Sequence, residues 1–301
     1  MSELLTKEAK SIERLKAFEP PEGYYLAFSG GKDSVVCKAL MEIAGVKYDA
    51  HYRVTSVDPP ELVRFIRDKH PDVERDVPRD DNGKPITMWN LIPRKLMPPT
   101  RLVRYCCSEL KEDGGDGRMT VTGVRWAESS NRQNNHGPVT MMGKSSAKAI
   151  GDSPDFQQVK KGGVILINDN TESRRMIESC YKRHKTTVNP IIEWTNDDVW
   201  TFIRAHGVSY CELYNCGFKR LGCVGCSMAP RKTRLKEFAL WPKFYDAYMN
   251  AFGKMLEARR ARGRLDSTWR KGETPQDVMN WWLETGVLPG QYDLFEMEDG
   301  G

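Results

Sequence analysis

The sequence predicts an α/β fold, a doubly wound parallel sheet followed by a helical C-terminal extension. Over roughly the first 200 residues, short apolar runs alternate with amphipathic helical segments, which is the pattern of βαβ units. A strand, a turn with two adjacent glycines and a helix follow one another between residues 24 and 44. Two long helical segments occur after residue 240, with no strand pattern beside them.

The stretch from residue 24 to residue 37 is the most informative part of the chain. Residues 24–28 are apolar and aromatic, so they predict a buried strand, and Asp33 or Ser34 is expected to cap the helix that follows. Adjacent glycines let the backbone approach an anion, and hydroxyls, a lysine and a helix N-terminus supply donors. An ordinary strand-to-helix turn is the alternative. The candidate phosphate-binding residues are Ser29, Gly30, Gly31, Lys32, Asp33 and Ser34.

The other elements follow in chain order. We expect helices at residues 3–18, 58–68, 87–95, 196–206, 240–262 and 275–284, with Thr195 as an N-cap. Further strands are expected at residues 47–54, 73–77, 119–124 and 164–167. Residues 133–162 are polar and rich in glycine, and we interpret them as an insertion or mobile lid.

Composition and charge limit the classes of protein. We expect an N-terminal helix at 1–20, a nucleotide-binding domain at 21–230 and a helical region at 231–301. No transmembrane span or signal peptide is expected, which favours the cytoplasm and no membrane partner. In that reducing compartment the eight cysteines are better explained as ligands, nucleophiles or core residues than as disulfides. The net charge of +5 is concentrated in residues 219–236 and 254–264, which form either a solvated face or a surface for a polyanion.

Two separated pairs of cysteines predict a metal centre. Cys223 and Cys226 form a Cys-x-x-Cys pair flanked by glycines, whereas Cys106 and Cys107 are adjacent. Adjacent thiolates span one tetrahedral zinc ion poorly but can reach neighbouring irons, so a [4Fe–4S] cluster is predicted, with structural zinc as the main alternative. Cys216 is a substitute ligand, a nucleophile or a surface thiol. Cys37, Cys180, Cys211 and the five histidines are expected to be structural.

Arginine residues after the fourth expected strand suit an oxyanion. Arg125 and Arg132 lie in a segment with several hydroxyl side chains, and guanidinium groups bind phosphate or sulfate in bidentate fashion. A surface loop with ion pairs is the alternative.

Taken together, these stretches resemble the PAPS reductase family. SGGKDS resembles the PP-loop of that superfamily, and Cys106-Cys107 with Lys111, residues 123–132, residues 189–200 and the Cys223/Cys226 hairpin follow in the family's order. The resemblance implies the adenine nucleotide α-hydrolase fold with a five-stranded parallel sheet. It also implies a nucleotide at residues 29–34, a substrate end facing Lys111, Arg125 and Arg132, and a cluster on the four paired cysteines, as in the adenylyl-sulfate reductase branch.

Two departures favour the ATP-using branch of the family. Sulfonucleotide reductases carry a catalytic cysteine in a C-terminal Glu-Cys-Gly motif, and this sequence has no cysteine after Cys226. Lys32-Asp33 also keeps the form found in enzymes that cleave ATP to AMP and pyrophosphate. The chain therefore resembles the branch that includes the iron–sulfur protein of DNA phosphorothioation and tRNA-thiolation enzymes.

That resemblance implies cleavage of ATP, with Mg²⁺, and adenylylation of an acceptor that then receives sulfur. The expected catalytic residues are Lys32, Asp33, Lys111, Arg125 and Arg132. A nucleic acid is the candidate acceptor, and a donor of the cysteine-desulfurase type would supply sulfur. The alternatives are a sulfonucleotide reductase that uses Cys216 or a partner's thiol, and a non-catalytic subunit that binds nucleotide or nucleic acid.

Overall fold

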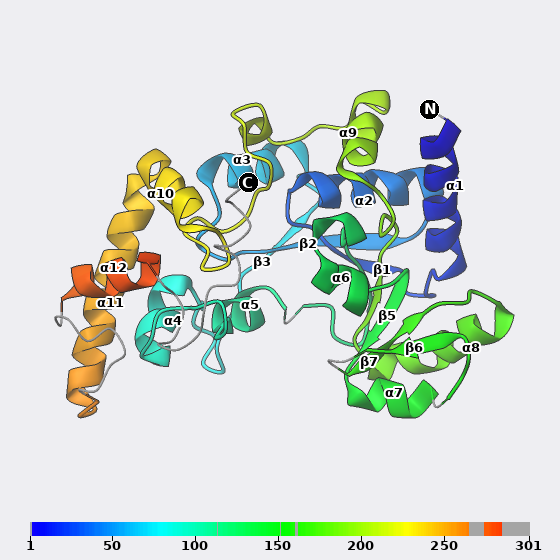
Figure 1. Cartoon of the computed structure of the whole chain (residues 1–301). Helices are drawn as coiled ribbons and strands as arrows, with labels where there is room; N and C mark the ends of the chain where they lie inside the picture. The colour runs from blue at the N-terminus through cyan, green and yellow to red at the C-terminus, as the bar shows by residue number, and fades with distance from the viewer. Residues whose placement is uncertain (1, 113, 151, 160–161, 265–273, 285–301) are drawn as a thin grey trace. The chain divides into compact units, whose positions relative to one another are not determined.

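The computed structural model describes residues 2–112, 114–150, 152–159, 162–264 and 274–284 (Figure 1). They form two compact units. The sheet unit is formed within Met1–Arg53, Pro60–Asp76 and Gly114–Leu221, and the helical unit within Val54–Pro59, Val77–Asp113 and Gly222–Gly301. Each unit therefore combines segments that are far apart in the sequence, whereas the sequence analysis divides the chain into consecutive segments.

The sheet unit contains an eight-stranded sheet in the order β3-β2-β1-β4-β8-β5-β7-β6. The strands from β3 to β8 in this order are parallel, and β5, β7 and β6 extend the sheet in antiparallel fashion. Strand order reverses direction at β1, so the crevice between the ends of β1 and β4 is a topological switch point. The bounds are β1 Tyr24–Ala27, β2 Tyr48–Arg53, β3 Glu74–Asp76, β4 Met119–Val121, β5 Val139–Met142, β6 Phe156–Gln158, β7 Gly163–Leu166 and β8 Thr186–Val188.

The predicted α/β class with a parallel-dominated sheet is confirmed. The strands beyond β4 in the sheet order differ from the expectation. The fifth parallel strand is β8, which the sequence analysis missed, while the strand expected at 164–167 is the antiparallel β7. The interpretation of residues 133–162 as a lid is wrong, because they contain β5, α7 (Lys144–Ile150) and β6. Val139 and Met141 are each 1% exposed, so this polar segment still supplies core side chains.

Helices α1 (Ser2–Ala17), α2 (Lys32–Ala44) and α9 (Asn196–Ala205) pack side by side in the sheet unit (Figure 1). α1 is anchored through its polar side chains, since Ser11 Oγ and Arg14 Nη1 both donate to the Pro190 carbonyl at 2.8 Å. The other α-helices of this unit among the described residues are α3 (Pro60–Lys69), α6 (Ser130–Asn135), α7 and α8 (Thr171–Cys180). Thr195 caps α9 as expected, in a capping box with Asp198.

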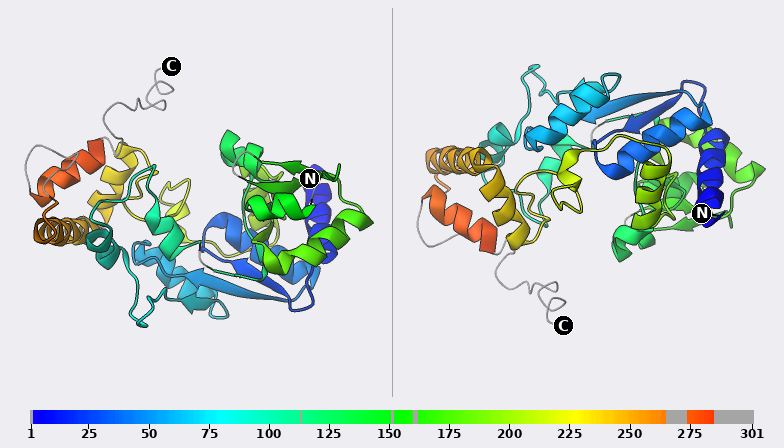
Figure 2. Two further views of the ribbon diagram at one scale, coloured as in Figure 1. Left: turned by 90° about the horizontal axis from the view of Figure 1, so that it is seen from below. Right: turned by 90° about the horizontal axis from the view of Figure 1, so that it is seen from above.

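The helical unit contains α4 (Met88–Lys95), α5 (Tyr105–Leu110), α10 (Arg231–Leu240), α11 (Pro242–Ala261) and α12 (Pro275–Glu284). α11 packs against both α4 and α12, as the views in Figure 2 also show. The helix expected at 240–262 begins only at Pro242, because proline suits the first turn of a new helix and breaks an existing one. Trp282, which is fully buried, contacts the rings of Phe238, Tyr248 and Phe252.

Among the described helices, none combines the length and the apolar composition that a membrane span requires.

Candidate functional site

The turn between β1 and α2 is shaped by two glycines. Gly30 has φ of +71°, and a Cβ atom there would lie 2.7 Å from Ile66. The N-cap of α2 is Gly31, without a side-chain cap, so the expectation that Asp33 or Ser34 caps this helix is wrong. Both residues instead lie in the first turn of α2. The donors at this helix N-terminus are therefore backbone amides without a side-chain cap.

Ser29 and Ser34 form hydrogen bonds within this turn. The Ser29 amide donates to Ser34 Oγ at 3.3 Å, and Ser34 Oγ donates to the Gly31 carbonyl at 2.9 Å. The Gly31 amide donates to Ser29 Oγ at 3.4 Å. The shape of the PP-loop, residues 29–34, is therefore supported by hydrogen bonds within the loop, and its two hydroxyls lie 3.2 Å apart.

Two buried cations share one carboxylate at the PP-loop. Lys32 Nζ lies 3.0 Å from Asp33 Oδ2, and Arg125 Nε lies 2.7 Å from Asp33 Oδ1. Lys32 is 4% and Arg125 is 3% exposed. Arg125 also donates to the Trp194 carbonyl at 3.2 Å, so its guanidinium is held inside the protein beside the PP-loop, and its expected role at the substrate end stays a prediction.

The end of β4 reaches the PP-loop because Gly123 permits a close approach. A Cβ atom at Gly123 would lie 2.9 Å from Asp33 Cβ and 3.0 Å from the Asp33 carbonyl carbon. Any larger residue would push this strand end away from α2. Gly123 thus allows Arg125, two residues later, to meet Asp33.

A cavity of about 200 Å³ lies beside the PP-loop within the sheet unit. The PP-loop contributes Ser29, Gly31, Asp33 and Ser34 to its lining, and Glu128, Arg132, Tyr214 and Arg220 line it from elsewhere in the same unit. Arg132 pairs with Glu128, four residues before it. The lining therefore combines hydroxyls and a helix N-terminus with two guanidinium groups, which is a suitable set of donors for phosphate oxygens.

Tyr214 is a site residue that the sequence analysis missed. Its hydroxyl accepts from the Lys32 amide at 2.9 Å, which is the first amide of α2. Its ring makes an edge contact with Trp200 at 5.1 Å. No local pattern marks this tyrosine, since it reaches the PP-loop only through the fold.

The four paired cysteines belong to one unit, the helical unit. Cys106 and Cys107 lie in α5, and Cys223 and Cys226 flank a turn before α10. Cys106 interacts electrostatically with Cys107 and with both sulfurs of the turn, so the two pairs come together. The exposed Cys216 belongs to the sheet unit, and its role as a substitute ligand stays a prediction. Cys37 and Cys211 are buried, as expected of core residues.

The turn at Cys223–Cys226 is held by backbone bonds and by glycine. Gly225 has φ of +70°, and a Cβ atom there would lie 2.5 Å from the Phe238 ring. The Gly225 amide donates to Glu237 Oε2 at 2.8 Å, and Tyr248 donates to the Val224 carbonyl at 3.1 Å. These contacts fix the direction in which the Cys-x-x-Cys pair presents its thiols.

Lys111 lies with the cysteines in the helical unit. The Cys223 sulfur raises the pKa of the Lys111 ammonium, and Asp58 acts in the same direction as Cys223. Burial in turn raises the pKa of the Cys223 thiol to about 11. Within α5, the Cys106 thiol donates to Cys107 and lowers the pKa of Cys107. The structure thus places Lys111 beside candidate metal ligands.

The spacing of the sulfur atoms bears on the choice of metal. Within the part of the chain that the structure describes, no three of these cysteine sulfurs lie within 4.8 Å of one another. Ligands of one tetrahedral zinc ion with Zn–S bonds of about 2.3 Å lie about 3.8 Å apart. The sulfurs are therefore more widely spaced than a closed zinc site requires.

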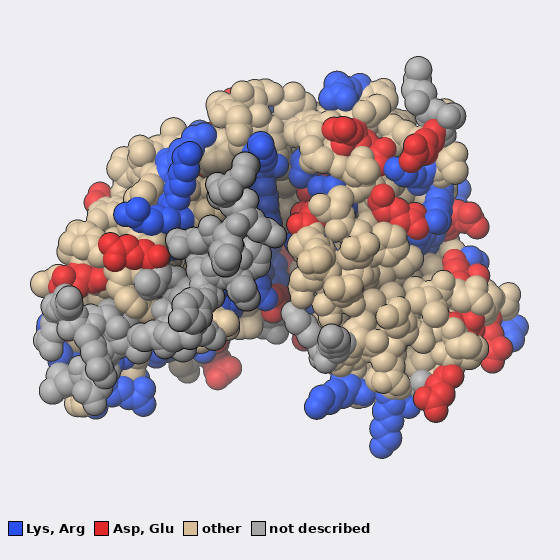
Figure 3. All heavy atoms as spheres, in the orientation of Figure 1, with Lys and Arg blue, Asp and Glu red and all other residues tan. Residues whose placement is uncertain are grey.

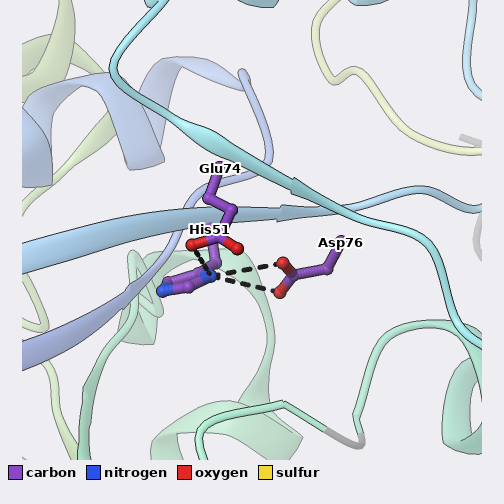
Figure 4. Close-up of side chains that lie close together, drawn as sticks. All are labelled: His51, Glu74 and Asp76. Carbon is purple, nitrogen blue, oxygen red and sulfur yellow. Dashed lines mark hydrogen bonds and ion pairs between the residues drawn. The ribbon is translucent and has the colours of Figure 1, made fainter.

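A second group with metal-ligating side chains lies on β2 and β3, where His51 faces Glu74 and Asp76 (Figure 4). His51 Nδ1 lies 3.2 Å from Asp76 Oδ2 and 3.8 Å from Glu74 Oε2, while Nε2 lies 2.7 Å from Asp49 Oδ2. Both ring nitrogens of His51 therefore have carboxylate partners within the protein. This arrangement agrees with the structural role expected for the histidine.

Basic side chains gather on the surface over α10 (Figure 3). Arg231, Lys232 and Lys236 on this helix are exposed. They form part of the positive segment that the sequence analysis marked as a solvated face or a surface for a polyanion.

A phosphate-type turn at the switch point of a parallel sheet defines a nucleotide-binding α/β protein. The sequence profile of the phosphoadenosine phosphosulfate reductase domain matches residues 23–229. The chain belongs to this family.

Similar curated proteins include adenosine 5'-phosphosulfate reductases. Those of Staphylococcus saprophyticus and Allochromatium vinosum are 48% and 43% identical over 42 residues, which is 14% of this chain and 17% and 16% of those proteins. An uncharacterized protein of Methanocaldococcus jannaschii is 22% identical over 244 residues, 77% of this chain and 42% of that protein. The chain thus covers less than half the length of each of these relatives.

Two solved structures show weak overall similarity. Phosphoadenylyl-sulfate reductase from Candida auris, in a phosphate complex, has a TM-score of 0.41 and 15% identity over 71% of this chain and 88% of that chain. FMN adenylyltransferase from Candida glabrata, with FAD and pyrophosphate, has a TM-score of 0.38 and 14% identity over 73% of this chain and 65% of that chain.

Proposed function

We propose that the chain binds ATP at the PP-loop, cleaves it between the α- and β-phosphates and activates an acceptor for sulfur transfer. The observation that carries this proposal is the pair of buried cations on Asp33, at the N-terminus of α2. Arg220 adds positive charge to the cavity beside them, whereas Glu128 and Arg132 pair with each other there. Such an excess of positive charge suits a polyphosphate.

In this mechanism the protein stabilises the leaving group. An acceptor oxygen attacks the α-phosphorus, the bond from that phosphorus to the bridging oxygen breaks, and pyrophosphate leaves with the electron pair. Lys32 and the amides of the PP-loop stabilise the charge that develops on pyrophosphate. Asp33 and Glu128 are carboxylates suited to Mg²⁺, which would neutralise phosphate charge when bound. A sulfur donor, of the cysteine-desulfurase type, then displaces AMP from the acceptor, for which a nucleic acid is the candidate.

We further propose that Cys106, Cys107, Cys223 and Cys226 hold a [4Fe–4S] cluster. The convergence of both pairs in the helical unit and the wide sulfur spacing support a cluster over a single zinc ion. When bound, such a cluster supplies a redox-active centre and joins α5 to the Cys223–Cys226 turn.

The test is the fate of ATP labelled at the α-phosphate, with bulk tRNA or double-stranded DNA as acceptor. We expect unlabelled pyrophosphate, with the label on the acceptor and released as AMP once a sulfur donor is added, rather than labelled ADP and phosphate. Lys32→Ala removes a charge-assisted contact worth roughly 1.5–3 kcal/mol, so turnover should fall about 10- to 100-fold. The matched control is Lys38→Ala on the same helix, whose ammonium pairs with Glu42 and Asp72.

Arg132 offers a test of whether the site is divided into a part that binds ATP and a part that serves the acceptor. Its guanidinium lines the cavity but lies outside the PP-loop. Arg132→Ala is therefore expected to lower turnover with acceptor while ATP affinity changes by less than about threefold, as for loss of a partly exposed charge. An equal loss of ATP affinity in Arg132→Ala and Lys32→Ala proteins would contradict this division.

A sulfonucleotide reductase is the second candidate function. The exposed Cys216 favours it, because this thiol lies two residues after Tyr214, which lines the cavity. Thioredoxin-dependent release of sulfite from adenylyl sulfate, lost on Cys216→Ser and without pyrophosphate release from ATP, would establish the reductase instead. Nucleotide binding without either reaction would indicate a non-catalytic subunit.

A further inference from the structure

Arg234 in α10 is a buried cation whose hydrogen-bonding groups are only partly used. It is 3% exposed. Nη1 donates to the Trp282 carbonyl at 2.7 Å, and the guanidinium lies over the Trp282 ring at 3.9 Å. Its Nε and Nη2 atoms are also buried, and within the described residues neither has a hydrogen-bond partner. One of its three nitrogen atoms is therefore satisfied.

Such an arrangement is costly unless an anion lies nearby. A buried charge that is not paired and fully hydrogen-bonded is strongly disfavoured, and burial lowers the pKa of Arg234 to about 10. The carboxylate one helical turn later, Glu237, accepts its hydrogen bond from the Gly225 amide. It attracts Arg234 electrostatically, but Nε and Nη2 of Arg234 still have no hydrogen-bond partner among the described residues.

The Cys223–Cys226 turn lies near Arg234, because Tyr248 donates to the Val224 carbonyl of that turn and packs on Trp282, over whose ring the guanidinium lies. Cys226 interacts electrostatically with Arg234. The buried hydroxyl of Tyr248 interacts electrostatically with Arg234 as well as with Cys106, Cys223 and Cys226. Lys111, the other cation of this site, has a carboxylate beside it in Asp58. Arg234, by contrast, has two nitrogen atoms without a hydrogen-bond partner among the described residues.

We propose that Arg234 is the buried counter-cation of the metal cluster on the four paired cysteines. The inference rests on the proposed cluster and adds a residue to it. Four thiolates carry more negative charge than the iron–sulfide core carries positive charge, so the bound cluster is an anion. Its sulfur atoms are the acceptors that the Nε and Nη2 donors of Arg234 lack. The arginine then holds the cluster in place and makes its reduction easier, because reduction adds negative charge next to a fixed positive charge.

The test compares cluster-loaded and cluster-free protein for wild type and Arg234→Met, prepared anaerobically from the full chain. Methionine keeps much of the side-chain volume and removes the charge. In cluster-free protein we expect the thermal midpoint to stay or rise, since an unbalanced buried charge is gone. In loaded protein we expect a lower midpoint, a more negative reduction potential and release of iron to a chelator that is about tenfold faster, as for loss of a charge-assisted hydrogen bond.

Two further variants complete the design. Arg259→Met is the matched control, because Arg259 also donates from Nη1 to a carbonyl of the helical unit, that of Leu96 at 2.9 Å. It should leave the reduction potential unchanged. Arg234→Lys keeps the charge but loses the forked donors, so we expect a reduction potential near that of wild type with faster iron release. This variant keeps the test informative should Arg234→Met fail to fold.

The outcomes separate the inference from the cluster assignment. Equal destabilisation of loaded and cluster-free Arg234→Met protein, with an unchanged reduction potential, would show that Arg234 only braces Trp282 and would overturn the inference. Zinc or no metal in anaerobic wild-type protein would overturn the cluster itself. That second result is read from iron and sulfide content before any variant is made.

Discussion

Replacing Arg125 by methionine tests whether the PP-loop depends on a long-range ion pair. The substitution removes the guanidinium that lies 2.7 Å from Asp33 and donates to the Trp194 carbonyl. Asp33 keeps Lys32 as its only cation in this group, and a buried carbonyl loses a donor. Breaking a buried pair costs about 3–5 kcal/mol, and the Asp33 side chain is 20% exposed, so we expect a loss of about 2–4 kcal/mol.

A double-mutant cycle isolates the pair itself. Asp33→Asn removes the carboxylate charge with little change in volume, and in the double variant neither partner is left uncompensated. The two costs should therefore fail to add, with a coupling free energy of about 1–3 kcal/mol. Arg174→Met is the control, because Arg174 pairs with Asp169 at 2.6 Å on the surface, where such a pair contributes less than about 1 kcal/mol.

The assay is equilibrium unfolding in urea, followed by tryptophan fluorescence, with ATP binding measured on the same preparations. Trp194 lies next to Arg125 and is 1% exposed, so its emission reports on this part of the sheet unit. Additive costs, or a loss below about 1 kcal/mol for Arg125→Met, would refute the reasoning, since a buried guanidinium that holds Asp33 cannot be removed so cheaply.

Three further outcomes are expected. Cys223→Ser should abolish the broad visible absorption of anaerobic protein, and stoichiometric zinc without iron in the wild type would contradict the cluster. Gly225→Ala should destabilise the protein by about 2–4 kcal/mol in thermal unfolding and lower its iron content, because the new Cβ meets the Phe238 ring 2.5 Å away at a positive φ; unchanged values would contradict the turn. The hydrogen bonds from Arg118 lower the pKa of Asp49, so its stabilising effect is present above the ordinary carboxyl pKa and disappears as the pH falls through the lowered pKa. Asp49→Asn should thus cost stability at pH 7 but not near pH 2, and a constant difference across this range would contradict the assignment.

Local patterns predicted the PP-loop because all of its chemistry lies within six consecutive residues. The cysteine pairs were visible for the same reason, since each pair occupies at most four positions. The N-cap of α2 was mispredicted because Ser34 bonds the Gly31 carbonyl and Asp33 turns to two cations, so neither side chain caps the helix. A cap prediction assumes that a side chain has no better partner elsewhere.

The missed elements have short or polar sequences. β8 is only Thr186–Val188, and a run of two threonines and a valine gives no periodic signal. It is buried because β4 and β5 pair on either side of it, which no local pattern reveals. Tyr214 likewise reaches the Lys32 amide across 182 positions. Sequence patterns therefore predicted the parts of the site formed by neighbours in the chain, whereas partners from distant segments required the fold.

Arg125 and Arg234 differ in a way that separates the two sites physically. Both are 3% exposed, but Arg125 has a carboxylate at 2.7 Å, whereas two nitrogen atoms of Arg234 have no partner among the described residues. A paired buried arginine stabilises the protein with or without a ligand, so Arg125→Met should be destabilising in every form of the protein. An unpaired buried arginine lowers the stability of the protein until an anion binds beside it. Arg234→Met should therefore leave unchanged or raise the stability of cluster-free protein and lower that of cluster-loaded protein. The same substitution at two equally buried positions thus distinguishes the two roles. Arg125 holds the PP-loop through its ion pair with Asp33, whereas Arg234 gains its hydrogen-bond acceptors only when the cluster is bound.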